Sequence, residues 1–246
     1  MIKIDDKNFI DYSPAPWDGN PLSMKANEIV NFKADNEANA NSLLEKFELK
    51  NYNINYTSCR FSTSDFHLKK SLYKFGYDFT EIVYGVVGVL SKLNIDETSF
   101  DKFNIEYSKI NDIETIYNYA ESFFYYGKFH EDPLISDLIS KKRNINMVKD
   151  IFPKSKTLLA KINKQVIGFM IFSEKLSDVN LLLGGMHPNY VHLSYPFWNK
   201  ILMELRSKKN KRVKTVISAA NINVVNLYNS FGFKISNAMW GCRKFR

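Results

Sequence analysis

The residues best suited to proton transfer lie together in one stretch near the middle of the chain. Residues 126–134 read YGKFHEDPL, and they place His130 two positions before Asp132. A histidine with a pKa near 6.5 can take up or release a proton close to neutral pH. An exposed turn built on the Asp-Pro pair accounts for the same residues equally well, so both interpretations stay open.

The two cysteines do not indicate covalent catalysis or a metal site. Cys59 and Cys242 have no neighbouring histidine and aspartate that would activate a thiol, and their spacing is not that of zinc ligands. The longest apolar run, residues 82–90, is too short to span a bilayer, and the N-terminus shows no apolar signal segment. We therefore expect a cytoplasmic, reduced protein without a metal or a membrane partner.

The charge is unevenly distributed along the 246 residues. Residues 1–103 carry 12 basic and 15 acidic side chains, whereas residues 104–246 carry 22 and 11. An anionic partner of the second part is plausible on this basis. Its densest basic run, residues 206–214, contains no aromatic residue, so a solvated helix end is favoured over a nucleic-acid site.

The hydrophobic pattern predicts an α/β fold with two parts, at residues 1–103 and 104–246. The polar stretch 92–101 is the candidate boundary between them. Residues 1–35 are expected to be irregular because three prolines interrupt them. Helices are predicted near 36–48, 66–75, 112–125, 134–150, 196–209 and 222–231, and strands near 52–61, 78–90, 157–162, 166–172, 179–186, 213–219 and 233–245.

A faint internal repeat links the two parts. Each has a strand, a helix and then a phenylalanine and glycine before the next strand, at Phe75-Gly76 and at Phe231-Gly232. Two copies of one unit would explain this order. A helix end capped by glycine is common, however, so coincidence explains it equally well.

The C-terminal part resembles the GCN5-related N-acetyltransferase (GNAT) superfamily. Asn221 is followed by Tyr228 after seven positions and by Gly232 and Phe233 after four and five more, which is the spacing of that family's last motif. The preceding order of a hairpin, a strand, a helix and a strand is similar too. The resemblance implies a GNAT fold, a mixed and mostly antiparallel twisted sheet flanked by helices, with a degenerate GNAT-like N-terminal half.

The resemblance also implies site residues for acyl transfer from acetyl-CoA to an amine. The hydroxyl of Tyr228 would protonate the departing thiolate, and the backbone near Met186 would stabilise the oxyanion; the alternative for Tyr228 is a place in the core. Coenzyme A would contact a group of residues before and within the last two helices. They are Gly185, Met186, His192, Ser194, Asn221 and Asn226. Asn221 also suits a helix N-cap.

Two shorter motifs resemble the sugar-nucleotide N-acetyltransferases related to TDP-fucosamine acetyltransferase. One is the Trp17-Asp18 opening, and the other is the loop with Phe129 and Asp132, where Lys128 replaces an arginine. This similarity implies transfer to the amine of a nucleotide-linked deoxyamino sugar, as in surface polysaccharide biosynthesis. The loop residues expected to bind that substrate are Tyr126, Phe129, His130 and Asp132.

The sequence departs from the family at the loop that would hold the coenzyme A diphosphate. Residues 191–196 read VHLSYP, without the usual glycines or a basic residue. Either the diphosphate is held at the same helix start or the donor site has decayed. The alternative functions are acylation of a peptide, protein or small amine, and a GNAT-like protein that binds without catalysis. A homodimer is compatible with the sequence, and nucleic acid is not an expected partner.

Overall fold

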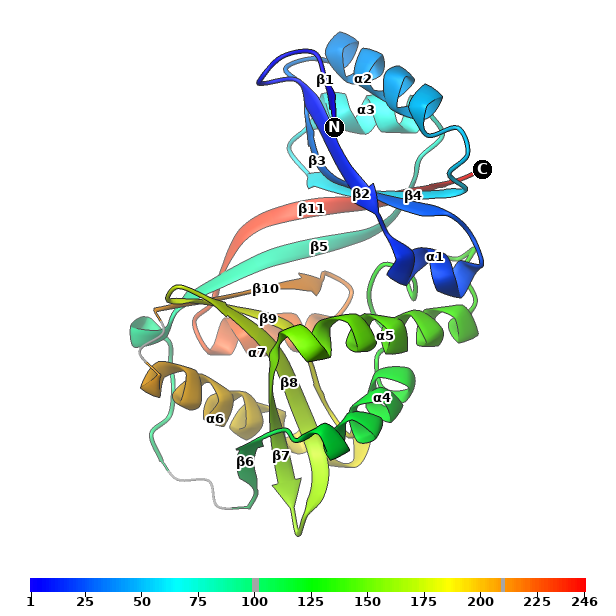
Figure 1. Cartoon of the computed structure of the whole chain (residues 1–246). Helices are drawn as coiled ribbons and strands as arrows, with labels where there is room; N and C mark the ends of the chain where they lie inside the picture. The colour runs from blue at the N-terminus through cyan, green and yellow to red at the C-terminus, as the bar shows by residue number, and fades with distance from the viewer. Residues whose placement is uncertain (99–101, 209–210) are drawn as a thin grey trace. The chain divides into compact units, whose positions relative to one another are not determined.

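A computed structural model describes residues 1–98, 102–208 and 211–246 of the chain. The chain divides into two compact units, each assembled from separate segments (Figure 1). The first unit comprises residues 1–83, 127–143 and 237–246, and the second comprises 84–126 and 144–236. The boundary predicted from the sequence divides the chain once, at residue 103, whereas these units combine separate segments, so that boundary stays a prediction. Residues 99–101 of the predicted linking stretch lie outside the described residues.

The first unit contains a sheet in the order β1-β2-β3-β4-β11, in which only the β3–β4 pair is parallel. Its own elements are β1 (Ile2–Lys3), β2 (Phe9–Pro14), α1 (Pro16–Leu22), β3 (Ala26–Lys33), α2 (Glu37–Lys50), β4 (Tyr56–Ser62) and α3 (Phe66–Lys74). Three further elements contribute residues to both units: β5 (Asp78–Val89), α5 (Asp137–Ile151) and β11 (Lys234–Phe245).

Helices α2 and α3 form because their apolar residues recur at helical spacing and face the sheet. Leu43 and Phe47 on α2, and Leu68 and Leu72 on α3, are buried in one cluster with residues of β3 and β4. Asn36 caps α2 by accepting a hydrogen bond from the backbone of Asn39. The helices predicted here from the sequence are confirmed.

The expectation that residues 1–35 are irregular is wrong. These residues contain β1, β2, α1 and β3. The three prolines stand where the elements tolerate them: Pro14 is the last residue of β2, Pro16 is the first of α1, and Pro21 lies in the last turn of α1. A proline at the start of a helix lacks only an N–H that would be unpaired there, so it does not prevent regular structure.

The second unit contains a sheet in the order β10-β9-β8-β7-β6. Its strands are β6 (Asn104–Tyr107), β7 (Lys156–Ile162), β8 (Gln165–Lys175), β9 (Asp178–Met186) and β10 (Arg212–Ser218). Its helices are α4 (Ile113–Ser122), α6 (Ser194–Ser207) and α7 (Ile222–Ser230), with the 3₁₀ turns η1 (Leu90–Lys92), η2 (Ile110–Asp112), η3 (Phe152–Lys154) and η4 (Pro188–Leu193). The predicted hairpin is β7–β8, whose turn residues Asn163 and Lys164 have φ of 47° and 70°.

Both faces of this second sheet are covered, which explains the long apolar run in β8. Ile167 and Met170 pack in the cluster that contains α6 and α7. Phe169 and Ile171 pack in the cluster that contains α4 and the end of α5. Neighbouring residues of a strand point to opposite faces, so a strand buried on both sides is continuously apolar. No helix among the described residues is long and apolar enough to cross a membrane.

Candidate active site

The second sheet opens between two parallel strands. Strands β9 and β10 pair over three residues each, from Asp178 opposite Arg212 to Asn180 opposite Lys214. Beyond these pairs β9 continues to Met186 without β10 beside it in register. The last link is the Thr215 hydroxyl, which donates to the carbonyl of Leu181 at 3.0 Å. Among the described residues, the C-terminal half of β9 therefore has an edge with no strand paired to it on the side of β10.

The backbone of Met186 points toward this open edge. The next residue, His187, donates its N–H to the carbonyl of Ile167 at 2.8 Å, on the side of β8. Successive N–H groups of an extended strand point to opposite sides, so the Met186 N–H points away from β8. The same alternation turns the backbone of Gly184 outward. The open edge thus presents polar backbone groups, as an unpaired strand edge does.

A β-bulge in β9 lies where this strand stops pairing with β10. The register between β8 and β9 shifts so that Leu182 has no partner, with Ile171 opposite Leu183 and Phe172 opposite Leu181. A bulge bends a strand and redirects the residues that follow it. Leu182 therefore marks the place at which β9 turns away from β10.

Tyr228 lies beside the point at which the strands diverge. Its ring is buried against Trp198 and Phe233, with ring centroids 6.4 and 4.9 Å away. Burial raises the pKa of the Tyr228 hydroxyl to about 12, and the Trp198 and Thr215 side chains partly oppose that rise. Thr215 directly follows the last paired residue of β10. Tyr228 is therefore a core residue and also lies near the point at which β9 and β10 diverge.

The remaining residues expected to contact coenzyme A are spread over η4, the start of α6, and α7 with its N-cap. Asn221 caps α7 by accepting from the N–H of Val224 at 3.3 Å, which confirms its N-cap role. Asn226 and His192 are exposed. Ser194 begins α6, and its hydroxyl donates to the carbonyl of Val191 at 2.7 Å. Their contacts with a ligand stay predictions.

The residues expected to bind the acceptor belong to different units. Tyr126 is the last residue of a segment of the second unit and is 48% exposed. Phe129, His130 and Asp132 belong to the first unit. Phe129 is buried in a cluster with Tyr56. Burial lowers the pKa of the His130 side chain, and the nearby Asp137 carboxylate partly offsets that decrease. Their role in binding a substrate stays a prediction.

The first unit contains buried ion pairs that the sequence did not reveal. The Asp18 carboxylate, which is fully buried, accepts from the Lys128 ammonium at 2.7 Å and from the Arg143 guanidinium at 2.7 Å. Asp132 is held by Arg243, whose Nε lies 2.7 Å from one of its oxygens. The Trp17-Asp18 and Phe129–Asp132 motifs are therefore joined through Asp18 and Lys128.

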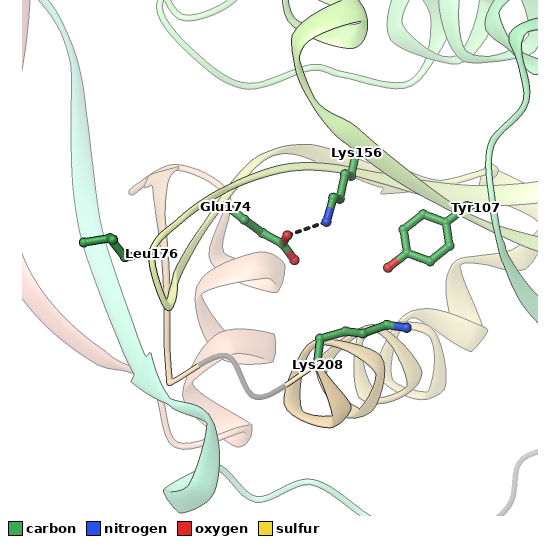
Figure 2. A pocket seen from close by; sticks show the side chains of 5 residues that line it. All are labelled: Tyr107, Lys156, Glu174, Leu176 and Lys208. Atoms are coloured by element: carbon green, nitrogen blue, oxygen red, sulfur yellow. Dashed lines mark hydrogen bonds and ion pairs between the residues drawn. The ribbon is translucent and has the colours of Figure 1, made fainter.

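A polar cavity of about 550 Å³ lies elsewhere in the second unit (Figure 2). Glu174 and Lys156 form an ion pair of 2.5 Å on one side of it, and Tyr107 and Lys208 complete the lining with the exposed Leu176. Glu174 and Leu176 precede the first residue of β9, at the end opposite Met186. This cavity is thus distinct from the open strand edge.

The basic run at residues 206–214 is mostly neutralised by its neighbours. Arg212 and Lys214 both pair with Asp178, at 2.8 and 2.9 Å. Lys209 lies outside the described residues. The pairing of Arg212 and Lys214 agrees with a solvated helix end.

Among the described residues no group of three or more acidic, histidine or cysteine side chains is arranged to hold a metal ion.

Comparison with solved structures defines the fold. A conserved protein of unknown function from Staphylococcus epidermidis matches with a TM-score of 0.67 at 15% identity, over 99% of this chain and 94% of that one. A GCN5-related N-acetyltransferase from Sphaerobacter thermophilus matches with a TM-score of 0.64 at 10% identity, over 96% of this chain and 76% of that one.

The fold is that of the GCN5-related N-acetyltransferases. A tandem GNAT protein of the clavulanic acid biosynthesis pathway matches as well, with a TM-score of 0.61 at 8% identity over 89% of this chain and 75% of that one. No family model and no curated protein matches the sequence. These comparisons confirm the predicted GNAT fold with two GNAT-like halves, and the relation to sugar-nucleotide enzymes stays a prediction.

Proposed function

We propose that this protein is an N-acyltransferase that uses an acyl-CoA thioester, and that the second unit carries the reaction. The observation that carries the proposal is the divergence of β9 and β10, which leaves the Met186 N–H on an open strand edge. An oxyanion that develops during acyl transfer needs such a fixed donor. The GNAT fold of the neighbours supports the same reaction class.

Each site residue has one role in the proposed reaction. The Met186 N–H donates to the thioester carbonyl oxygen while the acceptor amine attacks its carbon. As the C–N bond forms and the C–S bond breaks, the Tyr228 hydroxyl donates its proton to the departing sulfur. The proton that the amine nitrogen loses passes to solvent, from which the tyrosine is reprotonated. With a pKa of about 12 it remains protonated throughout the neutral range, so the proton is available. Its burial beside Thr215 supports this role because the ring has little freedom to turn away.

The uncovered edge of β9 suits the amide-containing arm of the acyl donor. Gly184 and Met186 direct backbone N–H and carbonyl groups outward, and an extended ligand can pair with such groups as an added strand would. These residues are therefore the proposed binding site for the pantetheine arm of acetyl-CoA.

The proposed acceptor is the amine of a nucleotide-linked deoxyamino sugar in the cytoplasm. Its support is the pair of motifs around Asp18 and Asp132 and the positive balance of residues 104–246. An anionic acceptor suits that balance, whereas a cationic peptide or polyamine does not.

A backbone substitution tests the proposed reaction. Met186→Pro removes the N–H on the open edge, and Met186→Leu retains it with a side chain of similar volume. We expect the proline variant to lose at least about 100-fold in kcat for acetyl transfer, as loss of an oxyanion donor does, while the leucine variant stays near the wild type. Equal rates in the two variants would disprove the role of this N–H.

The assay for this test measures thiol release from acetyl-CoA with a panel of amines. The panel contains TDP- and UDP-linked amino sugars, a lysine peptide and spermidine. Turnover with the sugar nucleotides alone supports the proposed acceptor. Turnover with only the peptide or the polyamine retains the acyltransferase and replaces the acceptor, and no turnover with any amine rejects the reaction.

A further inference from the structure

The helical segment after β9 begins at Pro188, before α6 itself. The turn η4 continues directly into α6, so the first N–H groups of the combined helix belong to η4. Pro188 has no N–H. Asn189 donates to Nδ1 of His187 at 3.2 Å, and Tyr190 donates to the carbonyl of His187 at 2.8 Å. The donors that usually make a helix start attractive to anions are therefore already bonded within the chain.

The first N–H groups of α6 are likewise not available to an anion. The N–H of Ser194 donates to the carbonyl of Val191, and Pro196 contributes no N–H. A diphosphate needs backbone donors or cationic side chains to replace its hydration. The chain has neither lysine nor arginine from residue 176 to residue 199. Both ordinary means of holding a diphosphate are thus missing from this segment.

The exposed surface at this helix start carries apolar side chains beside the uncharged Asn189 and His192. Val191 is 48% exposed and Tyr195 is 41% exposed. The Tyr195 ring stacks on Phe231 with centroids 4.6 Å apart and planes 8° from parallel. Burying a phosphate against such a surface costs hydration free energy without a compensating bond. The contrast with the polar backbone edge at Gly184 and Met186 is pronounced.

We propose that the acyl donor is recognised through its pantetheine arm and not through its diphosphate. The substrate class is then an acyl-pantetheine thioester, of which an acyl-CoA is one member. This inference rests on the proposed function, because it specifies which part of the acyl donor the open edge of β9 holds.

Paired donors and paired ligands test the proposal. Turnover is compared for acetyl-CoA and acetyl-pantetheine, and binding is measured by calorimetry for coenzyme A and pantetheine. We expect kcat/KM and Kd to agree within about threefold between the two members of each pair, which corresponds to less than about 0.7 kcal/mol. A preference for the CoA form above about 100-fold overturns the inference.

The two readouts separate this inference from the proposed function. Binding without turnover rejects the acyltransferase, while the ratio of the two Kd values still decides how the arm is recognised. If neither compound binds at millimolar concentration, both proposals are wrong.

Adding a charge provides a converse test. His192→Arg places a cation on the exposed face of η4, and we expect it to raise the preference for acetyl-CoA over acetyl-pantetheine by about tenfold, as a new charge-assisted contact would. Leu176→Arg is the control, since that side chain is fully exposed beyond the opposite end of β9. An equal gain in both variants, or no gain at His192, contradicts the argument that the diphosphate is not recognised because this segment lacks a cation.

A second inference rests on the two cysteines in the first unit. Cys59 on β4 and Cys242 on β11 stand directly opposite each other in the antiparallel register, with their Sγ atoms 3.1 Å apart. Opposed residues in such a pair have Cα atoms about 4.5–5.5 Å apart, which lies within the range that a disulfide spans. This pairing could not be predicted from local sequence, because 183 positions separate the two residues.

We infer that Cys59 and Cys242 are a site of disulfide formation when a peroxide reaches them. One thiolate attacks hydrogen peroxide, which gives a sulfenic acid and releases hydroxide. The sulfur of the other cysteine then displaces that hydroxyl group as water, so the two thiols are oxidised to a disulfide and the peroxide is reduced to two waters. Both side chains are 2% exposed, so the reaction proceeds through openings of the core.

Mass spectrometry after alkylation tests this pairing. Peroxide treatment of the whole protein should remove both alkylatable thiols and lower the mass by about 2 Da, with a rise in Tm because the bond links distant positions. Cys59→Ser and Cys242→Ser should each show no such product. Two thiols that stay alkylatable, or sulfinic acid without a disulfide, would contradict the inference.

Discussion

The two units repeat one arrangement, and they differ where the chemistry is proposed. Along the chain, the order β2-β3-α2-β4-α3-β5 corresponds to the later order β8-β9-α6-β10-α7-β11, and the last strand of each series contributes residues to both units. In each, the strand before the helix carries a one-residue bulge four positions after its first parallel partner. These residues are Val30, which follows Ala26, and Leu182, which follows Asp178. The internal repeat that the sequence left open is supported by this correspondence.

Helices α3 and α7, which follow β4 and β10, end in the same way but carry different side chains at one buried position. A left-handed glycine follows each helix, Gly76 with φ of 79° and Gly232 with φ of 81°. Four positions before the glycine stands Leu72 in the first unit and Tyr228 in the second. Both side chains are buried, but only the tyrosine carries a proton that can be donated. The repeat thus retains the packing position and changes its chemistry.

The strand edges differ in the same sense. Eight positions after the first parallel pair stands Ala34 in the first unit, and its carbonyl oxygen lies 2.6 Å from the Nε2 atom of His67. The corresponding residue of the second unit is Met186, whose N–H points to the open edge. In the first unit a side chain therefore occupies a backbone group at this position, and the repeated scaffold alone does not make a site.

Removing the phenol hydroxyl is expected to have the largest effect. Tyr228→Phe should lower kcat at least about 100-fold, because the departing sulfur loses its acid, and Tm should change little. The matched variant is Tyr77→Phe, which removes a buried hydroxyl bonded to Glu48 at 3.0 Å in the first unit. It should lower Tm and leave kcat unchanged.

The opposite pattern would reverse the assignment of chemistry to the second unit. A fall in Tm with unchanged kcat for Tyr228→Phe would make this tyrosine a core residue only. A fall in kcat for Tyr77→Phe would show that the first unit contributes a proton donor as well.

Breaking the buried ion pairs should produce the next largest effect, on stability. Asp18→Leu leaves the Lys128 and Arg143 charges buried without their shared carboxylate, which should cost about 3–5 kcal/mol in the free energy of unfolding. Asp178→Asn in the second unit is the comparison, since its partner Arg212 is exposed and its partner Lys214 is only partly buried. It should unfold near the wild type in urea. Similar midpoints for the two variants would show that the Asp18 cluster adds nothing.

The sequence predicted the elements with repeating apolar residues and the local motif around Tyr228. Leu43 and Phe47, for example, define the buried face of α2 by their spacing alone. It could not predict features that join distant segments. The pairing of Asp18 with Lys128 spans 110 positions, and no local pattern marks two charges as partners when they are that far apart. The open edge of β9 depends on where the pairing with β10 stops, which is also non-local.

A pH dependence offers a smaller effect that sharpens the comparison of Tyr228 with Leu72. The pKa of Tyr228 is raised to about 12 in the folded state by burial, against about 10 when unfolded. The folded state therefore favours the neutral phenol, so stability is complete below pH 10 and declines as the pH rises toward 12. Relative to Tyr228→Phe, the wild type should lose about 1 kcal/mol by about pH 10.5, measured by urea unfolding. A constant difference between the two proteins would show that the phenol ionises normally.

The smallest effect concerns the hydroxyl that completes the charged cluster of the first unit. The Lys128 ammonium donates to the Ser58 hydroxyl at 3.0 Å, in addition to its bond with Asp18. Ser58→Ala should reduce the free energy of unfolding by about 0.5–1 kcal/mol, because the ammonium loses one hydrogen bond but keeps Asp18 and Glu28 as acceptors. Ser62→Ala changes the same strand where the hydroxyl is exposed, and it should change little. Since Ser58 holds a cation that Asp18 already neutralises, the loss should be larger in the Asp18→Leu background, and an equal loss in both backgrounds would show that the two acceptors act independently.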